Sequence, residues 1–148
     1  MMIKVLKQCV IFVLIIMFLV GCGCKGKYEQ EDNKIIDLTK MSSTMVYSQV
    51  YSMVTSPEDF DGKEVIMEGN ITSFKFDEKD KLRHACVVQD ATACCEQGIE
   101  FELKNDAKTI KNYPDEGAKI KVVGIFKPYK RDKKVFCRLV NAHMTKID

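Results

Sequence analysis

The chain has 148 residues, which suffices for one domain of ordinary size and excludes a multidomain enzyme. Hydrophobic residues make up 46% and charged residues 30%, a balance typical of globular chains and not of disordered or collagen-like ones. The formal charge of +2 falls to zero without residues 1–21, which hold Lys4 and Lys7 and no acidic residue, so we expect no nucleic-acid partner.

The N-terminus has the pattern of an exported bacterial lipoprotein. Lys4 and Lys7 precede an uncharged, mostly apolar run over residues 9–20, which ends in the lipobox Leu19-Val20-Gly21-Cys22. A membrane helix needs roughly 20 apolar residues, so this shorter run predicts a signal segment. The similarity to lipoprotein precursors implies cleavage after residue 21 and a diacylated, palmitate-carrying Cys22. The alternative is an uncleaved membrane anchor in which Cys22 has no role. Both place the domain at the outer face of the bacterial cytoplasmic membrane.

Residues 22–36 are polar and lack apolar periodicity. Such a composition buries too little surface to order itself and predicts a flexible lipidated tether. The folded domain is therefore expected over residues 37–148.

One helix and five strands are expected in this domain. Ser42 or Ser43 can cap a helix that ends by Ser56, because Pro57 disfavours helical geometry in the residue before it. Apolar runs bounded by turn residues predict strands over 64–76, 83–89, 99–103, 119–126 and 135–140. Residues 106–113 have helical character and separate the third strand from the fourth.

This order predicts a mainly β domain, a five-stranded OB-fold-like barrel preceded by one N-terminal helix. The rival architectures are a small open β-sandwich and a split sheet, because strand order cannot be derived from one sequence. The expected buried barrel residues are apolar residues within the predicted strands, namely Val65, Met67, Phe101, Val122, Ile125 and Leu139.

Several motifs resemble a family of uncharacterised lipoproteins from clostridia and related Gram-positive bacteria. The most specific runs over residues 85–101 and contains Asp90-Ala91-Thr92-Ala93-Cys94-Cys95; the others are Asp37-Leu38-Thr39-Lys40-Met41 and Phe136-Cys137-Arg138-Leu139-Val140. The resemblance spans about residues 37–143 and implies an OB-like fold and an envelope location, but no reaction. A looser likeness, limited to the paired cysteines and the barrel, is to the exported C-terminal domain of a bacterial permease subunit.

Four cysteines belong to the predicted domain, and we expect Cys86, Cys94, Cys95 and Cys137 to meet at one end of the barrel. One interpretation is a zinc site, in which His84 takes part because it shares a strand face with Cys86. The second is a pair of disulfides, Cys86 with Cys94 or Cys95 and the remaining cysteine with Cys137. The third is a redox-active vicinal pair, Cys94 and Cys95.

A second candidate site is the basic hairpin between the last two predicted strands. Cations beside aromatic rings suit a polyanion, and the residues concerned are Lys127, Tyr129, Lys130, Arg131, Lys133, Lys134 and Arg138. The alternative is a charged hairpin that protects a sheet edge from aggregation.

The sequence lacks a glycine-rich phosphate loop, a serine nucleophile elbow and a zinc-protease helix motif, so we expect no enzyme. The main expectation is a lipid-anchored extracellular OB-like binding module, a non-enzymatic accessory of an envelope metal-handling or transport system. A membrane permease or a wall polymer is the expected partner. The alternatives are a thiol-based redox protein that uses Cys94 and Cys95, and a structural module that binds a wall polymer or another polyanion.

Overall fold

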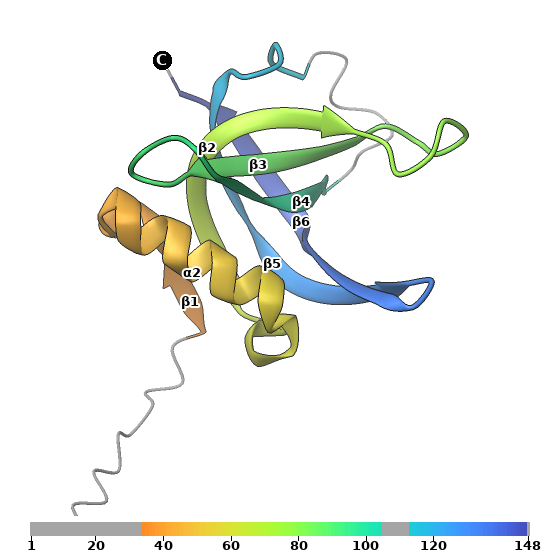
Figure 1. Cartoon of the computed structure of the whole chain (residues 1–148), viewed down its shortest axis with the longest axis horizontal. Helices are drawn as coiled ribbons and strands as arrows, with labels where there is room; N and C mark the ends of the chain where they lie inside the picture. Colours follow the sequence, from red (N-terminus) through yellow and green to blue (C-terminus); the bar gives the residue numbers. More distant parts are fainter. Residues whose placement is uncertain (1–33, 105–112, 148) are drawn as a thin grey trace, which may run out of the picture. The chain divides into compact units, whose positions relative to one another are not determined.

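The computed structural model describes residues 34–104 and 113–147. These residues form a mainly β structure with one α-helix and one six-stranded sheet (Figure 1). In chain order the elements are β1 (Ile35–Asp37), the 3-10 turn η1 (Leu38–Lys40), α2 (Ser43–Thr55), the 3-10 turn η2 (Pro57–Phe60), β2 (Glu64–Phe74), β3 (Arg83–Gln89), β4 (Glu96–Leu103), β5 (Lys119–Arg131) and β6 (Lys134–Lys146). The signal segment, Cys22, most of the tether and residues 106–112 of the segment with helical character lie outside the described residues.

The sheet has the order β1-β2-β3-β4-β6-β5, with an additional pairing between β2 and β5. The first half of β2 pairs with β5 from Glu64 to Asn70, and the second half pairs with β3 from Asn70 to Phe74. The pairings therefore run from β2 through β3, β4, β6 and β5 and back to β2. All of them are antiparallel except β1 with β2 and β4 with β6.

Alternating apolar residues fill the interior of the curved sheet, as period-two patterning requires. The strands contribute Val65, Met67 and Ile71 from β2, Ile120, Val122 and Phe126 from β5, and Leu139 from β6, all at most 1% exposed. Helix α2 packs beside β3, β4 and β6 and buries Val50 and Met53 completely. In the described part of the chain, no helix is long and apolar enough to cross a membrane.

The predicted helix is confirmed, with Ser42 as its N-cap residue and Ser56 as its C-cap residue. The strands are mostly longer than predicted. β4 begins at Glu96 instead of residue 99, and β5 and β6 extend until only Asp132 and Lys133 separate them. The extensions are rich in Lys and Arg, and cross-strand pairing stabilises them despite their weak apolar pattern.

A sixth strand, β1, was not expected. Ile35 and Ile36, assigned from the sequence to the tether, pair in parallel with the start of β2. Three residues carry too little pattern to predict a strand.

The core prediction is confirmed for five residues and wrong for Ile125, which is only half-buried. Along β5 the buried residues alternate without a break from Ile120 to Phe126, so Ile125 lies on the opposite face from Val122 and Phe126. The pairing of β5 with β6 shifts register between Val123 and Ile125. On β6 the shift lies beside Asn141, whose φ of 51° fits a β-bulge.

Candidate functional sites

The structure does not bring the four domain cysteines together. Cys86 on β3 is fully buried and Cys137 on β6 is 8% exposed, whereas Cys94 and Cys95 are exposed on the turn between β3 and β4. All four are free thiols. The separation follows from the strands, because Cys86 and Cys137 lie at inward-facing positions and the other two lie beyond the strand end.

The two buried thiols are packing groups. Cys86 lies opposite Ile71 of β2 and Ile99 of β4, and its Sγ fills the space above Gly69, 2.9 Å from where a Cβ of that residue would stand. Burial raises the pKa of the Cys86 thiol to about 12 and that of Cys137 to about 11. Both thiols are therefore protonated at neutral pH.

His84 does not join the exposed cysteines. Its Nδ1 lies 3.1 Å from the Ser73 hydroxyl, and its ring stacks on Tyr113 with centroids 3.7 Å apart. His84 stands near the start of β3, and the turn follows the end of that strand. Six residues of extended chain separate it from Asp90, about 20 Å.

Asp90 organises the turn that carries the exposed thiols. Its Oδ1 accepts hydrogen bonds from the backbone N–H groups of Cys94 at 3.0 Å and Cys95 at 3.4 Å. Its Oδ2 accepts from the Thr92 hydroxyl and the Cys94 thiol. Asp90, Cys94 and Cys95 form a cluster that could hold a metal ion. The sequence prediction missed Asp90, although an aspartate opening a short turn commonly caps the backbone amides that follow it.

Hydrogen bonding changes the pKa values of Asp90 and Cys95 in this cluster. Burial alone would raise the pKa of Asp90, but the bonds from Cys94 and Thr92 outweigh it and lower that pKa. The hydrogen bond with the Cys94 thiol raises the pKa of Cys95. Both thiols thus take part in hydrogen bonds within the turn.

Carboxylates pair with half of the six cations predicted in the basic hairpin. Lys127 pairs with Asp61 at 2.9 Å, and Arg138 with Glu102 at 3.0 Å. Arg131 pairs with both Asp77 and Asp80 of the β2–β3 loop, residues 75–82. Among the described residues, the hairpin cations without an ion pair are Lys130, Lys133 and Lys134. Fewer cations than the sequence suggested are free for a polyanion.

A buried carboxylate lies at the centre of the outward face of β3, β4, β5 and β6. Glu100 of β4 is 8% exposed and accepts hydrogen bonds from the Arg83 guanidinium and the Tyr129 hydroxyl, both at 2.6 Å. Burial and the bond to Glu100 raise the pKa of Tyr129 above its ordinary value. The Tyr129 ring stacks on Phe136 with centroids 5.8 Å apart, and the Arg138 guanidinium lies 5.0 Å from it. The network fixes these side chains in place.

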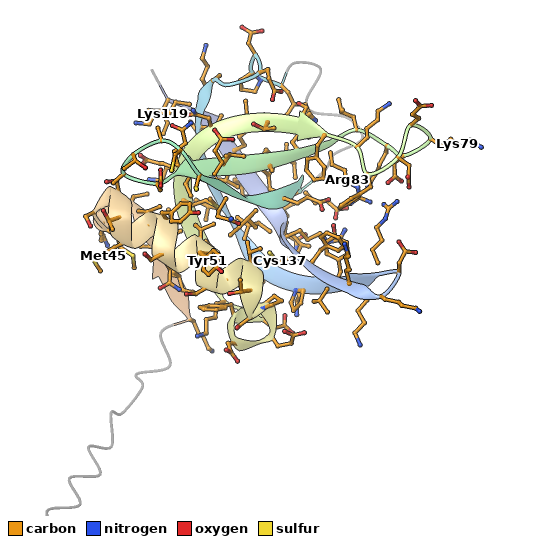
Figure 2. All side chains as sticks on the ribbon, in the orientation of Figure 1. Met45, Tyr51, Lys79, Arg83, Lys119 and Cys137 are labelled. Atoms are coloured by element: carbon orange, nitrogen blue, oxygen red, sulfur yellow. The ribbon has the colours of Figure 1, made fainter. Side chains whose placement is uncertain are left out.

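Phe76 connects the β2–β3 loop to this face. Its ring centroid lies 5.0 Å from that of Phe136, 4.4 Å from the Arg131 guanidinium and 5.3 Å from that of Arg83. Figure 2 shows Arg83 on the side of the molecule where Lys79 marks this loop, with Lys119 far from both. Between the loop and the β5–β6 hairpin is a hollow of about 480 Å³, lined by Phe76, Asp77, Arg131, Asp132, Lys133, Lys134 and Phe136.

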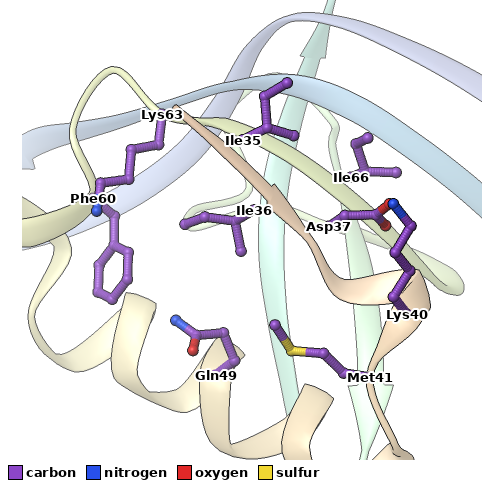
Figure 3. Close-up of a pocket in the computed structure, with 9 residues that line it drawn as sticks. All are labelled: Ile35, Ile36, Asp37, Lys40, Met41, Gln49, Phe60, Lys63 and Ile66. Atoms are coloured by element: carbon purple, nitrogen blue, oxygen red, sulfur yellow. The ribbon is translucent and has the colours of Figure 1, made fainter. Parts of the chain in front are cut away.

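A second, more apolar hollow of about 700 Å³ lies beside β1 (Figure 3). Ile35, Ile36, Met41, Phe60 and Ile66 contribute its apolar lining, and Gln49 of α2 faces it. Its charged groups already have partners, since the ammonium of Lys40 lies 3.1 Å from the carboxylate of Asp37 and that of Lys63 lies over the Phe60 ring. The sequence did not predict this hollow, and it contains none of the predicted site residues.

Comparison with family models finds no match to this chain, and comparison with curated proteins finds none either.

Proposed function

We propose that the protein is a lipid-anchored, non-enzymatic binding module of the OB type, which holds an anionic wall polymer in the hollow between the β2–β3 loop and the β5–β6 hairpin. The lipidated Cys22 and the tether would display this hollow outside the membrane. The accessory role in a transport or metal-handling system remains a prediction, as does the redox role of Cys94 and Cys95.

The strand order supports the OB assignment. The pairings around β2, β3, β4, β6 and β5 return to β2, and β4 pairs with β6 in parallel. An OB barrel has five strands in a partly open Greek key, and it binds ligands on one face and on the loops between strands 1 and 2 and between strands 4 and 5. In this chain those two loops are residues 75–82 and the β5–β6 hairpin, which line the hollow together.

The residues that line the hollow are the reason for proposing an anionic polymer as the ligand. Phe76 and Phe136 offer apolar ring surface, and Lys133 and Lys134 offer ammonium groups that pair with no carboxylate among the described residues. A polyol phosphate chain alternates C–H surface with phosphodiester charge and matches both features. Arg131 is held by two carboxylates, so it shapes the hollow and leaves the anion to the lysines.

The test is binding of a soluble poly(glycerol phosphate) chain by the full-length protein in detergent. The double variant Lys133→Ala/Lys134→Ala removes two exposed charge contacts of about 0.5 kcal/mol each, which corresponds to about fivefold weaker binding. The matched control is Lys119→Ala/Lys146→Ala, which removes two exposed cations from the other ends of the same two strands. The control variant should bind like the wild type.

If polymer binding weakened equally in both double variants, the effect would come from net charge alone. That result would contradict the assignment of Lys133 and Lys134 to the binding site. Lipid headgroups share the phosphate chemistry, so anionic phospholipid vesicles form the second arm of the experiment. Binding to vesicles, with no binding to the polymer, would also refute the proposal.

A further inference from the structure

The turn between β3 and β4 presents three metal-ligand atoms on one side. Backbone hydrogen bonds close the turn, from Asp90 N to the Cys95 carbonyl and from Ala93 N to the Asp90 carbonyl, both at 3.0 Å. Ala93 adopts a φ of 55°, which lets the chain reverse within these few residues. With the Asp90 carboxylate bound to the amides of Cys94 and Cys95, the two thiols and the carboxylate are held together.

Two of the three separations between these atoms are close to those that a tetrahedral metal ion imposes. Zinc–sulfur bonds of about 2.3 Å at a tetrahedral angle place two sulfurs about 3.8 Å apart, and a sulfur and a carboxylate oxygen about 3.5 Å apart. In the turn, the Sγ atoms of Cys94 and Cys95 are 3.6 Å apart, and Cys94 Sγ is 3.3 Å from Asp90 Oδ2. All three ligand atoms lie within 4.8 Å of one another. An ion could bind with only small changes in the turn.

The donor set selects the class of metal. Two thiolates with one carboxylate favour thiophilic ions such as Zn²⁺ and Cd²⁺ over Mg²⁺ and Ca²⁺, which take oxygen ligands. The cluster contains three residues in the described part of the chain, and Cys94 and Cys95 are exposed. The fourth position of a tetrahedral ion would therefore be open to water or to a ligand from another molecule, as in zinc sites that exchange ligands.

We propose that Asp90, Cys94 and Cys95 form an open three-ligand site for one thiophilic divalent metal ion. Binding would release the two thiol protons, and each thiolate would donate an electron pair to the ion without any change in oxidation state. Cys86, Cys137 and His84 take no part, because the first two are buried in the core and the third is held at the other end of β3. This site is independent of the polymer-binding hollow.

The experiment titrates the reduced full-length protein, in detergent, with Cd²⁺ and follows the ultraviolet charge-transfer absorption from thiolate to cadmium. The wild type should bind one ion that the double variant Cys94→Ser/Cys95→Ser does not bind. That variant keeps every other cysteine and so measures any binding by thiols elsewhere. Asp90→Asn retains an oxygen that can cap the turn but loses the charge, and it should weaken binding at least about tenfold. Cys137→Ala, which leaves the turn intact, should bind as the wild type does.

Equal cadmium absorption by the wild type and by Cys94→Ser/Cys95→Ser would overturn the proposal. A Cys94–Cys95 disulfide in protein isolated from membranes without reductant would overturn it as well, and would favour the redox interpretation. Polymer binding by Cys94→Ser/Cys95→Ser should be unchanged. The metal site and the polymer-binding hollow are therefore tested independently of each other.

Discussion

Glu100 is a buried carboxylate that holds Arg83 and Tyr129 on the outward face. The substitution Glu100→Gln keeps the size of the side chain and removes its charge. It replaces one carboxylate oxygen by an NH₂ group, which cannot accept a hydrogen bond from Arg83 or Tyr129. The Arg83 side chain is only 13% exposed and its Nε is already without a hydrogen-bond partner, so water cannot readily replace the lost carboxylate.

The expected cost follows from burial. A hydrogen bond to a charged group contributes about 1.5–3 kcal/mol, and leaving a buried charge unpaired costs about 3–5 kcal/mol. We expect Glu100→Gln to lower the free energy of unfolding by about 3 kcal/mol. Glu102 lies two residues away on the same strand face and pairs with Arg138, but the two side chains are 40% and 31% exposed. Glu102→Gln, the matched control, should therefore cost less than about 1 kcal/mol.

Urea unfolding at neutral pH, followed by circular dichroism, measures both values on the same scale. Unchanged m-values would show that the two variants unfold from the same native structure. If Glu100→Gln and Glu102→Gln cost the same within about 0.5 kcal/mol, the ion pair of Glu100 with Arg83 would not be buried as described here.

Three further predictions concern the thiols and the close packing of the strands. In the native protein, iodoacetamide should modify Cys94 and Cys95 but should reach Cys86 and Cys137 only after unfolding, as peptide mass spectrometry would show. Because burial raises the pKa of Cys86 from 9.0 to about 12, the unfolded chain releases that proton first as the pH rises. Stability should then fall between pH 9 and 12 by at most about 1.4 kcal/mol per pH unit, and Cys86→Ala should remove this part of the loss. Gly69→Ala would place a Cβ 2.4 Å from a carbonyl oxygen of β3, so it should cost at least about 2 kcal/mol in urea unfolding.

Local patterns predicted the centres of the elements well. The sequence predicts a helix that begins near Ser42 and a strand over 83–89, and both are present because apolar spacing and β-branched runs are local properties. The Ser42 side chain itself makes no capping hydrogen bond. The pairing of Ile35 and Ile36 with β2 depends on residues distant in sequence, so no local pattern reveals it. The misassignment of Ile125, by contrast, could have been avoided from the sequence, because Ile125 is three residues from Val122 and period-two alternation places the two on opposite faces of one strand.

In the candidate sites, too, some features follow from the local sequence and others depend on distant residues. The exposed turn position of Cys94 and Cys95 follows from their place between two strands, and Asp90 was within reach of the same local reasoning. Local reasoning could not predict the neutralisation of Arg131, because its partners Asp77 and Asp80 are more than 50 residues away in sequence. The inward position of Cys137 also follows from local alternation, because Cys137 lies two residues from Leu139, which the sequence predicts to be buried.

The most direct test of the proposed function is chemical-shift mapping of the full-length protein in detergent with poly(glycerol phosphate). The account predicts amide shifts at Phe76 and over residues 132–136, which line the hollow or lie beside its lining, and unchanged signals at the turn of residues 90–95. Shifts confined to the apolar hollow beside β1, or no shifts at a polymer concentration that saturates binding, would contradict it.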